Sequence, residues 1–432
     1  DRMKTDQIQK VHKDWYKLDL SAIVYPTLQR RDFSSVYRLS VLLKEDIDPE
    51  ILQRAVNLTM PRFPTYKAAI RKGVFWRYLE PNDRPGPFVQ EDVKNPCQPM
   101  HFKGNNRYLV RIYYYRNRIA LEAHHSLGDG TGGMCVLQTL TATYLRLKGH
   151  SEIENGGFVL DILGIPDPGE LEDAYMKYAN AKVCPPRPGE KTYRVRGTKE
   201  PFYTLNIIDG IMSVSEVMQV AKSYNATITE YLNSVLLYAL MQKQESEWHL
   251  KLRPVKIAMP VNLRRFFPSR TLRNFITMIY PGIDPRLGEY TFEEIVTQVH
   301  NYMRYYLNEK LLRGDITTNA ETQRNPFIRI VPLFIKDLVV RQFYSKIQDK
   351  NSSAGLTNMG ALKVPETMKP YIERFDIYMG QPFSTRTNCA IASFEDILTI
   401  NFASSIAETD VERLFFRKLV QDGIHVKIES NR

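Results

Sequence analysis

Apolar residues at alternating or helical spacing divide the N-terminal part of the chain into strands and helices. The stretch 35–44 is rich in Val, Leu and Tyr, which predicts a strand. In 47–61 the apolar residues share one helical face, with Asp48 before the first turn and Pro49 at its first position. We therefore expect a helix that Asp48 caps. The stretch 74–80 has the composition of a further strand.

A hairpin and a helix enclose the most unusual segment of the chain. Residues 108–125 predict a β-hairpin that turns near Arg116 and Asn117, with apolar side chains alternating along its second arm. From 131 to 148 the apolar spacing becomes helical, and Gly149 stands where a helix C-cap is expected. The segment between them is therefore a strand end, a glycine-rich turn and a helix start.

The C-terminal half mixes strands and helices in the same way. Residues 231–241 predict a buried helix, 255–264 a buried strand and 388–405 a second hairpin. Capping boxes, in which Glu follows Ser or Thr after three positions, open three predicted helices: Ser213-x-x-Glu216, Thr227-x-x-Glu230 and Thr409-x-x-Glu412. Both halves are thus expected to be α/β layers.

A proline-rich stretch suggests where the two halves meet. Residues 183–201 carry four prolines and many charged side chains, so they are the best linker candidate. A chain of 432 residues exceeds one ordinary core. We expect two domains, 1–190 and 191–432.

The composition narrows the class of protein. Hydrophobic residues make up 43% and charged residues 25%, as in ordered globular proteins. The sequence has no run of about 18 apolar residues, so we expect no transmembrane segment. Its charged N-terminus lacks the apolar core of a signal peptide, so we expect none there. The four cysteines have no metal-type spacing, which indicates reduced thiols. We expect a cytoplasmic protein.

The net charge is +11, which favours polyanionic partners such as nucleic acid, anionic lipid or a phosphorylated cofactor. The Lys and Arg residues are dispersed, and neither a compact basic stripe nor a nucleic-acid-reading motif is visible. We therefore expect no nucleic-acid partner.

The segment LEAHHSLGDGTGG (121–133) carries the candidate chemistry. A histidine titrates near neutrality, so it can take a proton from a hydroxyl or amine and return it. If strand alternation continues, His125 points to the side of the alternating apolar residues and His124 to the other side. The glycines are expected to let the chain turn sharply and bring backbone N–H groups near a ligand. Asp129 needs a cationic or N–H partner and is expected to lock the turn.

Three other interpretations of this segment are open. The histidines could be a core pair in a structural turn. A metal site would need His125 and Asp129 aligned on a helix, against which Gly128 and Gly130 argue. The run GDGTGG could cradle a phosphate at the start of the following helix, but it lacks the Lys and the spacing of a P-loop.

The motif resembles a known signature. HHSLGDG (124–130) matches the HHxxxDG pattern of the chloramphenicol acetyltransferase-like superfamily, which includes condensation domains of peptide synthetases and the BAHD, polyketide-associated and alcohol acyltransferases. IDPEILQRAVNLTMPRFPTYKAAI (47–70) is similar to the family's first helix and strand, and SVSEVMQVAKSYNATITEYLNSVLLYALM (213–241) to the helix pair opening its second domain. The resemblance implies an α/β fold of two chloramphenicol-acetyltransferase-like domains. By the same resemblance we expect each domain to be a mixed β-sheet with flanking helices, and an active-site channel to lie between them.

By this resemblance His125 is the general base. It deprotonates an acceptor that attacks a thioester carbonyl directly, without a covalent acyl-enzyme and without a metal, while N–H groups or a hydroxyl near the turn hold the oxyanion. Asp129 is structural and pairs with an arginine of the second domain. Arg264, at the end of the predicted strand, is the expected partner, and Arg265 and Arg273 are alternatives.

The resemblance also assigns neighbouring residues. His124 shapes the turn, and Gly130 keeps the channel open beside the base. The segment LTNMG (356–360) resembles the channel floor, so Asn358 and Gly360 are expected to line it, although Asn358 also suits an ordinary turn.

The sequence departs from some relatives. It has no DFGWG segment, a hallmark of the BAHD group, and we expect no attached carrier-protein or adenylation domain. It resembles bacterial alcohol acyltransferase-like proteins, and its basic surplus suits the phosphates of acyl-CoA. We expect an O-acyltransferase with acyl-CoA as co-substrate and no permanently bound cofactor. The alternatives are an acyl-carrier protein as donor, an amine as acceptor, and an inactive relative that only binds a ligand or partner.

Overall fold

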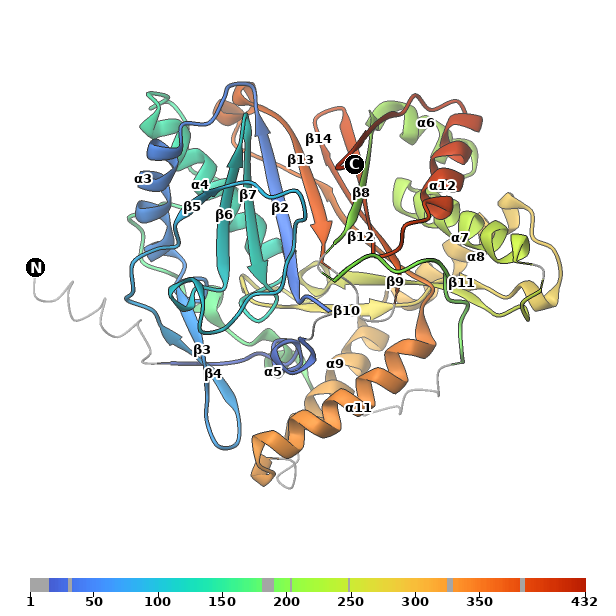
Figure 1. The fold of residues 1–432 in the computed structure, drawn as a ribbon, viewed down its shortest axis with the longest axis horizontal. Helices are drawn as coiled ribbons and strands as arrows, with labels where there is room; N and C mark the ends of the chain where they lie inside the picture. The colour runs from blue at the N-terminus through green and yellow to red at the C-terminus, as the bar shows by residue number, and fades with distance from the viewer. Residues whose placement is uncertain are drawn as a thin grey trace, which may run out of the picture.

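The computed structural model describes residues 15–29, 33–180, 190–202, 204–247, 249–324, 329–380 and 385–432. These residues form two lobes that lie side by side, each a β-sheet with helices packed against it (Figure 1). The expected mixed α/β class is confirmed. Among the described helices, none combines the length and the apolar character that crossing a bilayer requires.

The sheet of the first lobe has five strands in the order β13–β2–β7–β6–β5. The predicted hairpin is present as β6 and β7, and the helix capped by Asp48 is α3, where the Asp48 carboxylate accepts the N–H groups of Glu50 and Ile51. The bounds are β2 Val36–Leu43, β5 Val89–Glu91, β6 Val110–Tyr115, β7 Arg118–His124, β13 Ile372–Met379 and α3 Pro49–Thr59.

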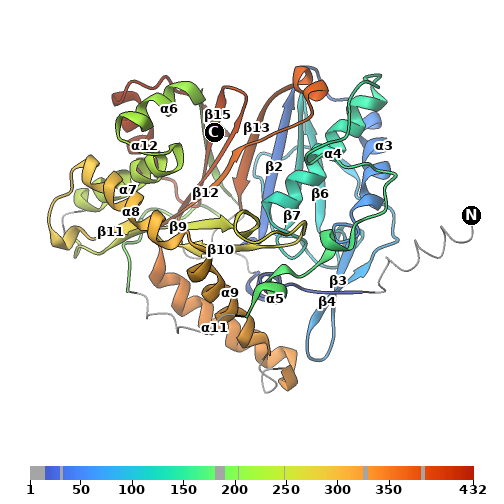
Figure 2. The ribbon, with the colours of Figure 1, turned by 180° about the vertical axis from the view of Figure 1, so that it is seen from behind.

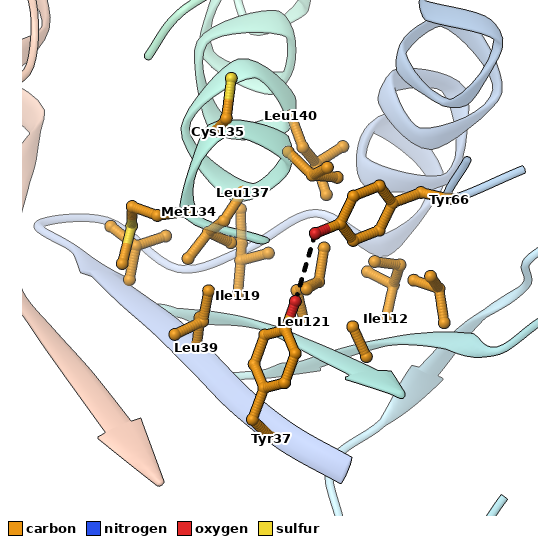
Figure 3. Packing of buried hydrophobic residues seen from close by; sticks show 14 of the residues in the cluster. Tyr37, Leu39, Tyr66, Ile112, Ile119, Leu121, Met134, Cys135, Leu137 and Leu140 are labelled. Atoms are coloured by element: carbon orange, nitrogen blue, oxygen red, sulfur yellow. Dashed lines mark hydrogen bonds between the residues drawn. The ribbon is translucent and has the colours of Figure 1, made fainter. Parts of the chain in front are cut away.

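Helix α4 (Gly130–Leu147) forms the centre of this lobe. Every residue from Gly132 to Leu145 is buried, and the helix lies across one face of the sheet (Figure 2). Side chains of α4 pack on those of β2 and β7, as Figure 3 shows for Met134, Leu137 and Leu140. Beside them the hydroxyls of Tyr37 and Tyr66 are hydrogen-bonded at 3.3 Å. This packing fixes the start of α4 relative to the end of β7.

The second lobe contains a mixed sheet in the order β10–β9–β12–β14–β15–β8–β16, with β11 paired to β9. The predicted strand at 255–264, the second hairpin and the buried helix at 231–241 are present as β9, β14–β15 and part of α7. The strands are β8 Asn206–Ser213, β9 Val255–Asn262, β10 Ile276–Ile279, β11 Gly282–Ile283, β12 Ala354–Ala361, β14 Thr387–Phe394, β15 Ile397–Ser404 and β16 Lys427–Ser430. The helices packed here are α6 Val214–Ser223, α7 Ile228–Ser246, α8 Phe292–Tyr306 and α12 Asp410–Gln421.

The three predicted capping boxes have different outcomes. Thr227 and its Glu form the complete reciprocal box at the start of α7. At α6 the Ser213 hydroxyl accepts the N–H three residues on, but the Glu216 carboxylate bonds to His425 instead. At α12 the predicted box is wrong. The Thr409 side chain makes no cap hydrogen bond, and the buried Glu412 carboxylate accepts from the Thr387 hydroxyl of β14 instead.

A third, small sheet and four further α-helices also lie in the described part of the chain. The predicted strand 74–80 begins later than expected, at Arg77, because Gly73 and Trp76 close a tight turn in which the Gly73 N–H donates to the Trp76 carbonyl at 2.8 Å. The sheet is β1 Tyr16–Lys17, β4 Arg77–Pro81 and β3 Ala68–Lys72. The helices are α2 Tyr25–Leu28, α5 Ala174–Tyr178, α9 Glu309–Arg324 and α11 Leu333–Asn351.

The lobes share a strand. β13 comes from the C-terminal half but pairs with β2 of the first lobe. Side chains of β15 reach its backbone, since Thr399 donates to the Phe375 carbonyl and Asn401 accepts the Ile377 N–H. A division into 1–190 and 191–432 stays a prediction, and residues 183–189 of the expected linker lie outside the described residues.

Candidate active site at the His125 turn

His125 directly follows β7, and both lobes hold its backbone. Its N–H donates to the Ser35 carbonyl at 2.8 Å, and its carbonyl accepts from the Asn274 side-chain amide at 2.8 Å. Its ring stacks on that of Tyr25 with centroids 4.8 Å apart and lies 4.6 Å from that of Tyr37. Backbone and ring contacts together fix the direction of the imidazole.

His124 points into the opposite side of the sheet, as strand alternation predicts. Its ring is fully buried against Phe102, and its Nδ1 accepts the Ser126 N–H at 3.2 Å. Its Nε2 lies 3.1 Å from the Gln29 side-chain oxygen and therefore carries the proton. Burial, with a further effect of His125, lowers the pKa of His124 to about 3. Both ring nitrogens are thus engaged by the protein, which suits the expected role in shaping the turn.

His125 is a neutral base with one ring nitrogen buried. Burial lowers its pKa to about 4, opposed by the Asp129 carboxylate and the Asn274 side chain. Its Nδ1 and the Asn274 Oδ1 are both buried, and neither has a hydrogen-bond partner among the described residues. The residue as a whole keeps part of its surface accessible. At neutral pH the imidazole can therefore accept a proton.

Asp129 ties the turn to both lobes. As N-cap of α4, its Oδ1 accepts the N–H groups of Thr131 and Gly132 at 3.1 and 3.2 Å. Its Oδ2 accepts from Arg264 Nη1 at 2.7 Å and from the Phe275 N–H at 2.9 Å. The expected ion pair between Asp129 and Arg264 is present, and the buried carboxylate is fully partnered.

Arg264 also holds a segment of the second lobe against the turn. Its guanidinium donates to the carbonyls of Thr271 and Arg273, and we call residues 271–275 the strap. The two alternative arginines lie elsewhere: the Arg273 side chain pairs with Asp19 at 3.6 Å, and that of Arg265 lies near Gly360. Arg264 thus joins Asp129 to the strap.

The glycines of the turn serve close packing. None of them has a left-handed φ, so the turn does not depend on a backbone conformation reserved for glycine. A Cβ on Gly132 would lie 1.9 Å from the Leu272 carbonyl oxygen of the strap, and one on Gly128 would lie 2.4 Å from it. Gly130 faces the side chain of Met359, whose sulfur would lie 3.1 Å from a Cβ there. Two glycines therefore admit the strap, and Gly130 admits a residue of β12.

The segment around Met359 meets the turn through that residue. Asn358 donates to the Thr229 hydroxyl at 2.8 Å and accepts the Gly360 N–H at 2.7 Å. Gly360 has φ +71°, which favours glycine. The Asn358 side chain is thus engaged inside the second lobe, and its lining role with Gly360 stays a prediction.

Sequence reasoning missed the partners that the fold brings from far away. The Asn274 amide donates to the buried Asp19 carboxylate at 3.1 Å as well as to the His125 carbonyl. Burial raises the pKa of Asp19, although Arg273 opposes this. Tyr25, the stacking partner of His125, comes from the short helix α2. None of these residues stands in a recognisable spacing, because tertiary contacts alone unite them.

Comparisons with known proteins establish the fold. No protein-family model matches the sequence, and no curated protein matches it significantly. The structure is similar to the trichothecene 15-O-acetyltransferase TRI3 from Fusarium sporotrichioides, with 12% identity, 94% of both chains covered and a TM-score of 0.59. It is similar to F. sporotrichioides TRI101 solved with coenzyme A and T-2, with 12% identity, 96% of this chain and 100% of that chain covered and a TM-score of 0.60.

A condensation domain shows the same likeness. The first condensation domain of the calcium-dependent antibiotic synthetase has 14% identity, a TM-score of 0.56, and 96% of this chain and 99% of that chain covered. At these identities the similarity concerns the fold and selects no subfamily. Across nearly its whole length the chain has the two-lobed fold of the chloramphenicol acetyltransferase-like and condensation-domain acyltransferases.

Proposed function

We propose that the chain is an acyltransferase that moves an acyl group from a thioester, acyl-CoA, to the hydroxyl of an alcohol. One observation carries the proposal: His125 is a neutral, partly accessible imidazole held in one direction where the two lobes meet. The shared fold supports it, since one structure of this fold is a 15-O-acetyltransferase and another was solved with coenzyme A.

In the proposed reaction His125 takes the proton of the acceptor hydroxyl as the oxygen attacks the thioester carbonyl. The tetrahedral intermediate then expels the thiolate, which receives that proton from the imidazolium. No covalent acyl-enzyme forms and no bound cofactor takes part. A His125 Nδ1–H that donates to the Asn274 Oδ1 would leave Nε2 as the basic nitrogen, and both atoms are buried without another partner among the described residues.

The remaining site residues have supporting roles in this proposal. Asp129 and Arg264 hold the turn against the strap, and His124 fixes the end of β7. Gly130, Asn358 and Gly360 line the path of the substrates through a channel between the lobes. We propose the cytoplasm as the compartment, where acyl-CoA is available.

Thiol release tests the proposal. Acetyl- to palmitoyl-CoA should release CoA in the presence of an alcohol from a panel, and His125→Ala should reduce the rate by about 10²–10⁴-fold, the usual contribution of a general base. His101→Ala, an exposed histidine outside the turn, serves as the matched control and should keep the wild-type rate. Equal activity of His125→Ala and the control would refute the assignment of the base.

A carrier-borne donor is the second candidate, favoured by the similarity to a condensation domain. It predicts acyl transfer from a phosphopantetheine-bearing carrier protein, with amines included among the acceptors, and little release from free acyl-CoA. Absence of transfer from both donors, in a protein that still binds coenzyme A, would instead indicate an inactive binding relative.

A further inference from the structure

Helix α11 is attached to the body of the protein by its charged face. Asp337 accepts from Arg77 of β4 at 2.5 Å and from the Thr27 hydroxyl of α2 at 2.8 Å. Arg341 donates to the Thr27 carbonyl at 2.9 Å, and Lys336 donates to a backbone carbonyl of the β3–β4 turn at 2.9 Å. In an ordinary amphipathic surface helix the polar face points to solvent instead.

The apolar face of α11 consequently points outward. Phe334 is 74% exposed and Leu338 60%, and Ile335 and Val339 lie next to them on the same face. Isolated exposed apolar residues are normal on a protein surface, but a contiguous group at helical spacing marks an interaction site.

The β3–β4 turn extends this surface. The Leu333 N–H at the start of α11 donates to the Val74 carbonyl at 2.9 Å, and both elements project from the same edge of the molecule (Figures 1 and 2). Val74 is 71% exposed and Trp76 49%. We call the combined surface the α11 patch, and its members are Val74, Phe75, Trp76, Ile330, Phe334, Ile335, Leu338 and Val339.

The charges around the α11 patch are mostly positive. The segments 71–77 and 329–341, which contain the patch, hold six Lys and Arg residues (Arg71, Lys72, Arg77, Arg329, Lys336 and Arg341) and one acidic residue, Asp337. Arg77 is buried in its ion pair with Asp337, and Arg71 pairs with Glu80 just outside the first segment, so these segments together with Glu80 keep a net charge of +4. Two copies joined patch to patch would bring these like charges together. An anionic bilayer instead offers phosphates to the cations and an acyl boundary to the apolar side chains. Tryptophan, as in Trp76, is enriched at that boundary.

We propose that the α11 patch docks the protein on an anionic phospholipid surface. The side chains of the patch enter the headgroup–acyl boundary, while the net positive charge of this region, including the exposed Lys72, attracts the lipid phosphates. The proposal does not depend on the acyltransferase reaction. It does connect the patch to the candidate site through α2, because Thr27, which anchors α11, lies two residues from Tyr25, and the Tyr25 ring stacks on His125.

Vesicle binding tests the proposal. Flotation of the full chain with phosphatidylcholine vesicles, with and without phosphatidylglycerol, should show binding that requires the anionic lipid and weakens with added salt. The variant Phe334→Gln/Leu338→Gln should lose at least about tenfold in partitioning, because membrane affinity scales with the buried apolar area. Leu163→Gln/Leu287→Gln is the matched control, since these leucines are 89% and 80% exposed and lie outside the patch.

Three outcomes would overturn it. They are no binding to vesicles that contain phosphatidylglycerol, equal binding of the patch variant and the wild type, or an equal loss in the control variant. Sedimentation velocity tests whether a second copy of the chain occupies the patch. If the wild type is a dimer and Phe334→Gln/Leu338→Gln is a monomer, the patch is a dimer interface and the proposal fails. All substituted residues are exposed, so circular dichroism should show unchanged folding.

Discussion

Gly132→Ala should destabilise the protein at a position where alanine normally stabilises. In a helix interior alanine is favoured over glycine by about 0.8–1.0 kcal/mol. At Gly132, in the first turn of α4, the new Cβ would lie 1.9 Å from the Leu272 carbonyl oxygen and 2.8 Å from the Tyr66 hydroxyl. The first contact is with backbone, so the strap itself has to move.

The structure sets the size of the loss. Overpacking typically costs about 1–3 kcal/mol. Arg264 also donates to the carbonyls of the residues on either side of Leu272. A displaced strap therefore weakens a charged hydrogen bond worth about 1.5–3 kcal/mol. After subtracting the helical gain of about 1 kcal/mol, we expect a net loss of about 1.5–5 kcal/mol in the free energy of unfolding. Gly130→Ala is the matched control, because its Cβ would meet the flexible end of Met359 at 3.1 Å and should change that free energy by less than about 1 kcal/mol.

Urea denaturation followed by far-ultraviolet circular dichroism measures both variants under one condition. The midpoint of Gly132→Ala should fall well below that of the wild type, and that of Gly130→Ala should stay close to it. If the two variants unfold at the same urea concentration, the close approach of the strap does not explain the glycine. A stable Gly130→Ala protein that loses acyl transfer would support the proposed place of Gly130 beside the substrate path.

Three further predictions concern the turn. Asp129→Asn should lower the free energy of unfolding by about 3–5 kcal/mol, because it leaves Arg264 buried without its anion. The double variant Asp129→Asn/Arg264→Met should lose less than the sum of the two single losses. Additive losses in this double-mutant cycle would contradict the pairing. Burial lowers the pKa of His125 from 6.5 to about 4, so the unfolded chain binds more protons between these values and stability falls as the pH drops from 6.5 to 4. Denaturation against pH should show a slope smaller by up to about 1.4 kcal/mol per pH unit in His125→Gln, and an unchanged slope would refute the shift. Asn274→Leu should lower kcat by at least about tenfold, but by no more than the 10²–10⁴-fold that a general base contributes. It should also move the acid limb of kcat/KM to lower pH, because the Asn274 side chain raises the pKa of His125. A loss confined to KM would exclude a positioning role.

The elements of the fold were predictable where the signal is local. The hairpin at 108–125 follows from alternation, and the cap at Asp48 from a side chain that bonds two N–H groups of its own helix. The capping box at Thr409 failed because Glu412 found a more distant partner in Thr387. Likewise β13 joins the sheet of the other lobe, and no periodicity in the sequence indicates which sheet a strand enters.

The candidate site was predictable in part, and for a different reason. The pairing of Asp129 with Arg264 came from a family resemblance, since no spacing rule connects residues that are 135 positions apart. Asn274 and Asp19 carry no motif at all, and only the folded chain places them behind His125. The glycines were recognised, but their packing against the strap was not predicted, because contact with a distant carbonyl leaves no mark in the local sequence.

The residues of the motif divide according to what they face. His125 alone presents an accessible basic group, whereas Asp129, Gly128 and Gly132 all face the strap. The strap also carries Asn274, which holds the His125 carbonyl. Any change that loosens the strap should therefore reach the base through the Asn274 amide, so stability and turnover are expected to fall together for substitutions at the motif's aspartate and structural glycines. Substitution of His125 itself should separate them, with activity lost and the contact between the lobes retained.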